Sequence, residues 1–200
     1  MNYKVLDFDG KPYHGGNGVW SLPNNGDPGE WMPVIHDIKP CWQGYHVLKR
    51  EGVVQWLGPE LYEVEIREPV IWDVDKGVCA EARLLRKLET WNSYTARLFA
   101  MDCAEHVSHL SFYPNCRLAT EVARKYEMLD KIIAEAEVTT KAATMIAAWT
   151  AKVAACSAKP TPRATADWAV ERCWQTDRLF EYLEKGEKWR KTFKRQSNSL

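Results

Sequence analysis

The sequence has neither a long apolar run nor an excess of charge of one sign. Its alanine-rich stretch 142–151 is far shorter than the ~20 apolar residues that cross a bilayer. The first ten residues hold two aspartates and no apolar signal-peptide core. We therefore expect a cytoplasmic protein, in the host cytoplasm if a phage encodes it, with no membrane partner. The 27 basic and 27 acidic side chains balance, which argues against polyanion binding through bulk charge.

Cysteine pairs at redox or metal-binding spacing are also missing. None of the six cysteines forms a C-x-x-C pair, so we expect free thiols rather than a disulfide framework. Cys103, His106, His109 and Cys116 are the densest set of soft ligands. His109 lies well round a helix from Cys103, and Cys116 would have to fold back after a break. We expect no metal.

The familiar enzyme signatures are absent as well. The sequence holds no glycine-rich phosphate loop, no serine nucleophile elbow and no H-E-x-x-H zinc motif. The sequence does not decide whether the chain is an enzyme, but it favours a protein that acts by binding.

Glycine, proline and alanine divide the chain. Nine of the eleven glycines and seven of the ten prolines precede residue 70, whereas alanine and apolar helical periodicity dominate after residue 90. This boundary predicts an α+β protein, with a β-rich domain over residues 1–89 and a helical domain over residues 90–200. The ten tryptophans occur in both halves and indicate packing before they indicate a site.

The first half predicts short antiparallel strands. Tyr3–Leu6 and Lys11–Gly16 flank a turn, Arg50–Trp56 is typical of a short helix, and Leu61–Ile66 alternates apolar and polar residues. Residues 78–88 fit a helix by propensity and a strand by context, and we favour the strand.

The second half predicts about four helices in an antiparallel array with a basic C-terminal tail. Apolar spacing places them over residues 90–110, 117–128, 131–158 and 163–185. The tail, residues 185–195, is compatible with nucleic acid, but no nucleic-acid module accompanies it, so specific binding to DNA or RNA is not expected.

Two resemblances to known families accompany these patterns. Gly44-Tyr45-His46, the short helix, Gly58-Pro59 and the strand 61–66 resemble a small β-rich domain of unknown function that is frequent in phage and prophage genomes. That resemblance implies no particular activity.

The second half resembles an all-helical family of immunity proteins from bacterial toxin systems. The residues that carry this resemblance are Trp91, Ala96–Ala100, Asp102–Val107, Tyr113-Pro114-Asn115 and Trp174–Leu179. The family implies binding to a host or competitor protein. Trp168, Trp174 and Arg178 are the candidate interaction residues, since tryptophan and arginine dominate binding hot spots. Together the two resemblances point to a phage or prophage accessory protein with an immunity-like or anti-defence role.

The alternative hypothesis places a small-molecule site in the first half. The order His14, Tyr62, Glu81 resembles small ADP-ribosyltransferase-like folds, in which a histidine and a tyrosine hold the nucleotide and a glutamate polarises a ribose hydroxyl. Tyr45, His46 and Trp56 would be ligand-binding residues, and the loop Pro23–Gly29 a lid. This hypothesis implies a nicotinamide or cyclic nucleotide as the ligand, and otherwise no cofactor is expected.

Overall fold

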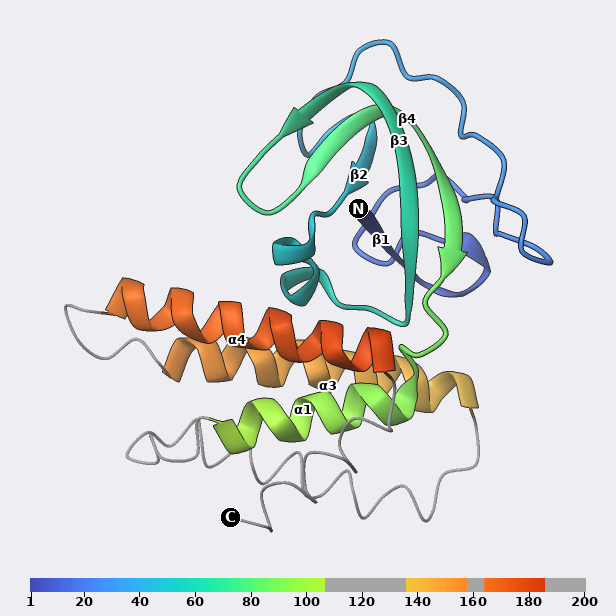
Figure 1. Ribbon diagram of the computed structural model, residues 1–200. Coiled ribbons are helices and arrows are strands. Elements are labelled where there is room, and N and C mark those ends of the chain that lie inside the picture. Colours follow the sequence, from blue (N-terminus) through green and yellow to red (C-terminus); the bar gives the residue numbers. More distant parts are fainter. Residues whose placement is uncertain (107–135, 158–163, 186–200) are drawn as a thin grey trace. The chain divides into compact units, whose positions relative to one another are not determined.

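The computed structural model describes residues 1–106, 136–157 and 164–185. The chain divides into two compact units, Met1–Leu88 and Glu89–Leu200. The first unit contains a four-stranded antiparallel sheet and the second contains helices (Figure 1), so the predicted α+β class is confirmed.

The sheet of the first unit has the strand order β1-β3-β4-β2, and all neighbours are antiparallel. The edge strands approach each other where Tyr3 and Leu48 exchange backbone hydrogen bonds of 2.8 and 2.9 Å. The sheet is therefore strongly curled, as Figure 1 shows, around a core that takes side chains from all four strands. The strands are Asn2–Leu6 (β1), Tyr45–Val47 (β2), Glu60–Trp72 (β3) and Gly77–Lys87 (β4).

The long β3–β4 hairpin confirms two sequence predictions. The strand expected over Leu61–Ile66 is the first half of β3, and residues 78–88 form β4 rather than a helix. Pairing and burial outweigh helix propensity here, because side chains of β4 enter the core of the curled sheet. The register shifts between Arg67 and Val70, where Pro69 lacks the N–H that a regular ladder needs.

The prediction of a second strand over Lys11–Gly16 is wrong. After β1 the chain forms a 3-10 turn, η1 (Phe8–Gly10), and then meets β1 through an isolated bridge between Leu6 and Pro12. Pro12 has no N–H to donate, and the two glycines that end the segment adopt φ values of 94° and 106°, outside the strand region. The segment is therefore free to turn away from the sheet.

The short helix predicted over Arg50–Trp56 is a 3-10 helix, η2, with those bounds. Gly52 permits a close approach, since a Cβ atom there would lie 2.0 Å from the carbonyl oxygen of Asp75. The approach holds the end of η2 against the β3–β4 turn, so that the Trp56 indole N–H donates to Asp75 Oδ2 over 2.8 Å.

A loop segment, residues 29–35, lies along β4 where β2 has ended. The N–H groups of Gly29, Met32 and Ile35 donate to carbonyls of β4 over 2.9 to 3.0 Å. These bonds fix the segment to the sheet, and the side chain of Met32 joins the core.

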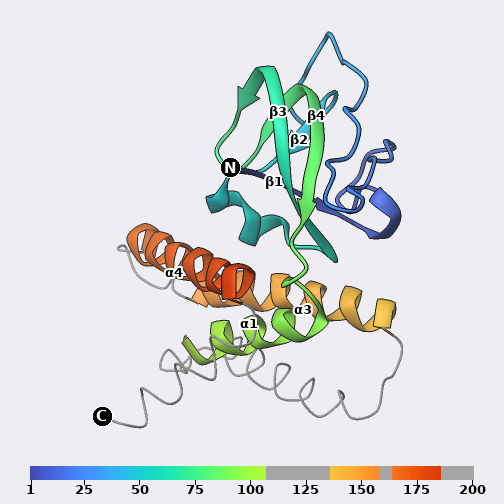
Figure 2. The same cartoon turned by 45° about the vertical axis from the view of Figure 1, so that its right-hand side comes forward.

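The described helices of the second unit are α1 (Ser93–His106), α3 (Ala136–Ser157) and α4 (Ala164–Lys185), shown from two sides in Figures 1 and 2. They confirm three of the predicted helices. Contacts of Thr90 with Leu183 and of His106 with Glu171 show that α4 runs antiparallel to α1.

The close packing of the helices follows from small side chains. Ala147, Ala151 and Ala154 of α3 are fully buried, and alanine at this spacing lets backbones approach. The predicted helix over residues 117–128 and the basic tail beyond residue 185 lie outside the described residues. Among the helices that the structure describes, none has the length and apolarity that crossing a membrane requires.

Candidate functional site

A cavity of about 770 Å³ opens in the first unit, among β1, β2 and the loops that precede and follow them. This volume falls within the range of small-molecule sites, which is ~300–1,000 Å³. Four of the residues singled out from the sequence line it together. The aromatic residues that line the cavity are Tyr13, His14, Trp20, Trp42, Tyr45, His46 and Trp56.

The charged side chains that line the cavity, in this fully described unit, are two lysines, Lys4 and Lys76. The ammonium of Lys4 lies 5.0 Å from the ring centroid of Trp20, and that of Lys76 lies 4.5 Å from the centroid of Trp56. Each cation therefore faces an aromatic ring rather than a carboxylate. Burial lowers the pKa of Lys4 to about 8, so at neutral pH it remains mostly protonated at a cost in desolvation.

His46 lines the cavity together with the two lysines. Burial lowers its pKa, and the positive charges of Lys4 and Lys76 lower it further. The ring is consequently neutral at neutral pH. Its Nε2 atom accepts a hydrogen bond of 3.0 Å from the backbone N–H of Cys41.

His14 also lines the cavity, where it contacts Trp56. Its Nε2 atom lies 2.8 Å from the carbonyl oxygen of Trp56, so this nitrogen carries the proton in that contact. The His14 ring meets the Trp56 ring edge to face with centroids 5.2 Å apart. His14 is thus held in position against Trp56 at the cavity.

Tyr45 lines the cavity, and Cys79 of β4 contacts its backbone from the core. The Tyr45 hydroxyl donates to the Pro33 carbonyl over 2.7 Å, and its ring packs against Trp20. Cys79 Sγ donates to the Tyr45 carbonyl, and burial raises the pKa of the thiol to about 11. A thiol with that pKa is a poor nucleophile at neutral pH.

The structure does not bring Tyr62 and Glu81 to this cavity, as neither is among the described residues that line it. Tyr62 is buried in the core, and its hydroxyl donates to Glu60 Oε2 over 2.7 Å. Glu81 lies on β4 and accepts from Arg67 over 3.0 Å.

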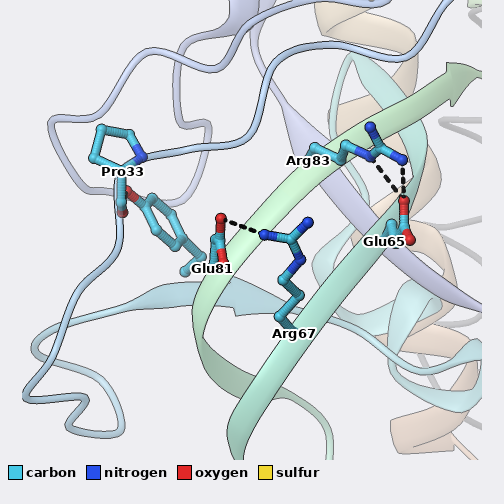
Figure 3. A network of polar contacts seen from close by, with 6 residues as sticks. Pro33, Glu65, Arg67, Glu81 and Arg83 are labelled. Atoms are coloured by element: carbon cyan, nitrogen blue, oxygen red, sulfur yellow. Dashed lines mark hydrogen bonds and ion pairs between the residues drawn. The ribbon is translucent and has the colours of Figure 1, made fainter.

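Glu81 belongs to an alternating ladder of ion pairs between β3 and β4. Figure 3 shows Arg67 reaching Glu81 and Arg83 reaching Glu65. The guanidinium carbons of both arginines lie over the ring of Trp31, at 3.8 and 4.7 Å from its centroid. Glu81 therefore has a structural role, pairing the strands beneath the covering loop.

The predicted lid also lies elsewhere. Residues 23–29 are not among the described residues that line the cavity, and Asn24 and Asp27 exchange backbone hydrogen bonds across their own turn. The turn Lys39–Gln43 does line the cavity, through Cys41, Trp42 and Gln43.

In the helical unit, the predicted interaction residues engage other side chains of their own unit. The rings of Trp174 and His106 stack with centroids 3.7 Å apart. The guanidinium carbon of Arg178 lies 5.2 Å from the centroid of the same Trp174 ring. Arg178 also pairs with Asp102 and Glu181 over 3.5 and 3.1 Å. Its side chain is only 13% exposed. Trp168 is half-buried, with Arg172 over its ring.

The soft ligands considered for zinc have other surroundings. Cys103 is fully buried, and burial raises the pKa of its thiol. The Nδ1 atom of His106 contacts Glu171 Oε2 at 2.8 Å. His109 and Cys116 lie outside the described residues. Within the part of the chain that the structure describes, no group of three His, Cys, Asp or Glu side chains is arranged to hold a metal ion.

Three further residues that line the cavity are not among the candidates from the sequence: Lys4, Lys76 and Trp42. A signal existed for Lys4, because it is two residues from Leu6 on a strand and so faces the same side as that core residue. Lys76 and Trp42 belong to turns, where no periodicity reveals direction.

Comparison of the chain with protein-family models, with curated proteins and with solved structures gives no significant match.

Proposed function

We propose that the protein acts by binding, and that its first unit captures a small phosphorylated anion in the cavity without turning it over. The observation that carries the proposal is that Lys4 and Lys76 line one cavity, and that they are its charged lining residues. Clustered cations in a partly desolvated cleft create the potential that attracts an anion.

Burial of Lys4 supports a role in binding rather than in folding. A protonated amine that gives up hydration without gaining a carboxylate partner costs stability. An anionic ligand would supply the missing counter-charge. The hydrogen bond from Lys4 Nζ to the His46 carbonyl, at 2.8 Å, holds the amine in place and leaves protons for a ligand.

The transferase hypothesis is less well supported than capture. It requires a carboxylate beside His14, whereas Glu81 pairs with Arg67 on β3. In the setting that the two family resemblances imply, capture of a phosphorylated metabolite or signal by a phage or prophage accessory protein would be an anti-defence function.

A thermal-shift titration with pyrophosphate, AMP, cyclic AMP and NAD tests the proposal. A ligand at ~100 times its dissociation constant adds about 2.7 kcal/mol to the free energy of unfolding. We expect a shift with one or more of these anions and a loss of affinity of about tenfold or more in Lys4→Met and Lys76→Met, because each removes a charged hydrogen bond. Lys152→Met, an exposed lysine of α3, is the matched control.

Two results would count against capture. One is a folded wild-type protein that none of the four anions shifts. The other is a shift that Lys152→Met reduces as much as the two cavity variants, which would indicate binding through general surface charge. Release of a cleaved product from a bound nucleotide would replace capture by an enzyme function.

Protein binding by the helical unit is a second candidate. It is favoured by apolar side chains that α3 and α4 leave in solvent, Met145, Trp149 and Val170, with exposed fractions of 56%, 39% and 68%. These, rather than the engaged Trp174 and Arg178, are the residues to substitute. Met145→Glu and Val170→Glu should abolish co-purification of a host or competitor protein while leaving anion binding unchanged.

A further inference from the structure

Trp42 is the most unusual side chain at the cavity. It lines the cavity and yet is 90% exposed. Its indole packs on no ring or cation in the described part of the chain. Trp20 and Trp56 differ from it, because a lysine ammonium lies over each of their rings. An indole left in water at the mouth of a site has a large apolar face available.

On the basis of the function proposed above, we propose that the captured anion is a nucleotide, with its phosphate held by Lys4 and Lys76 and its base stacked on Trp42. The side chains that line the cavity favour a ligand with both parts. Two ammonium groups select for phosphate, and a free indole selects for a planar ring, because every base offers a π-face to an aromatic side chain. A sugar phosphate or an inorganic anion would bind the two ammonium groups and leave the Trp42 indole without a partner.

The turn that carries Trp42 is held in a defined position. Lys39 and Gln43 exchange backbone hydrogen bonds of 2.7 and 2.9 Å at its base, and Cys41 adopts a φ of 66° at its tip. The N–H of Cys41 donates to His46 Nε2. His46 therefore contacts both parts, because its carbonyl accepts from Lys4 Nζ and its imidazole accepts from the N–H of the Trp42 turn.

The geometry behind the turn is equally restrictive. Gly44, with a φ of 124°, has no room for a side chain, since a Cβ atom would lie 2.3 Å from Val78 Cγ2. The chain thus passes directly from the Trp42 turn into β2 with no bulky residue between them.

Calorimetric titration of the full chain with AMP, ribose 5-phosphate and adenosine separates the two parts. Ribose 5-phosphate keeps the phosphate and lacks the base, and adenosine keeps the base and lacks the phosphate. We expect AMP to bind more tightly than either fragment. Cyclic AMP and NAD titrated alongside AMP indicate which nucleotide fits best.

Variants at Trp42 then assign the base. Trp42→Ala should weaken AMP binding by roughly 5- to 150-fold, the range of one lost stacking contact, and should leave ribose 5-phosphate binding unchanged. Trp42→Phe should restore most of the difference. Trp149→Ala, which removes a tryptophan from the helical unit, is the matched control and should have no effect. Because Trp42 is exposed, neither of its variants is expected to lower the melting temperature.

The outcomes distinguish the two proposals. If AMP binds no more tightly than ribose 5-phosphate, or if Trp42→Ala weakens both equally, the nucleotide assignment is overturned while anion capture stands. If none of pyrophosphate, AMP, ribose 5-phosphate, cyclic AMP and NAD binds, anion capture fails and the nucleotide assignment fails with it.

Discussion

The ammonium of Lys4 donates a hydrogen bond of 2.8 Å to the backbone carbonyl of His46, and so joins the two edge strands of the curled sheet. Burial lowers the pKa of this lysine to about 8, which means that its charged form is disfavoured in the folded protein. Lys4→Met should therefore raise the free energy of unfolding at pH 7 by an amount on the order of 1 kcal/mol, after the lost hydrogen bond is counted. Urea denaturation measures the change.

The sign of this effect depends on pH in a defined way. The unfolded lysine titrates near 10.5 and the folded one near 8, so between these values the unfolded state binds more protons and the wild type gains stability as pH rises. The advantage of Lys4→Met should be largest below pH 8 and should shrink towards pH 10.5. A variant that is less stable than wild type at pH 7 would contradict this account of Lys4.

Ligand affinity should also follow the titration of Lys4. Only the protonated amine attracts an anion, so affinity should fall as pH rises through about 8, by about tenfold at pH 9 for a single charge. Lys4→Arg is the control, because a guanidinium stays protonated throughout this range. Calorimetry of pyrophosphate binding at pH 7, 8 and 9 gives the profile. An equal fall in wild type and Lys4→Arg would assign the titration to another group.

Acid should release the Trp42 turn. The lowered pKa keeps His46 neutral, and its Nε2 accepts from the Cys41 N–H only while unprotonated. As pH falls through a value below the usual 6.5, the acceptor is lost. Fluorine NMR of 5-fluorotryptophan protein, with the Trp42 signal assigned through Trp42→Phe, should show this signal shift with acid. In His46→Gln, whose amide oxygen remains an acceptor, the Trp42 signal should not titrate.

Glu81→Gln distinguishes capture from transferase chemistry. Glu81 pairs with Arg67, whose side chain is about half exposed, so the change should cost no more than about 1 kcal/mol of stability. Because Glu81 does not line the cavity, nucleotide affinity should change less than about twofold, well under the effect of one lost charged contact. A tenfold loss of affinity, with the melting temperature preserved, would return Glu81 to the site.

Local sequence patterns predict single strands of this sheet, whereas the pairing between strands depends on residues far apart in the chain. The alternation of apolar and polar residues over Leu61–Ile66 predicts a strand, and that strand is the first half of β3. Burial does not alternate there, because residues 60–64 are all buried, Glu60 and Glu63 among them. The register does not follow from alternation, because the shift between Glu63 and Val64 lies among the ion pairs and so decides which acid meets which base. The partner of Glu81 therefore depends on the register, and in the folded sheet that partner is Arg67 of β3.

The candidate site also depends on contacts between distant parts of the chain. The sequence singles out four aromatic residues, and one cavity brings them together: His14, Tyr45, His46 and Trp56. Their meeting depends on backbone contacts such as the Tyr3–Leu48 pair, which no local pattern encodes.

The helical unit contains a buried polar contact with a measurable contribution to stability. Tyr182 is fully buried, and its hydroxyl donates to Asp102 Oδ2 over 2.6 Å, joining α4 to α1. Tyr182→Phe removes the donor and leaves a carboxylate that is only 9% exposed with one partner fewer. Leaving a buried acceptor less satisfied costs about 1–3 kcal/mol, so urea unfolding should show a loss of this size.

Tyr94→Phe, on an exposed face of α1, is the matched control and should change stability by less than about 0.5 kcal/mol. A loss no larger than that of the control would mean that Arg178, 3.5 Å from the same carboxylate oxygen, compensates for the hydroxyl.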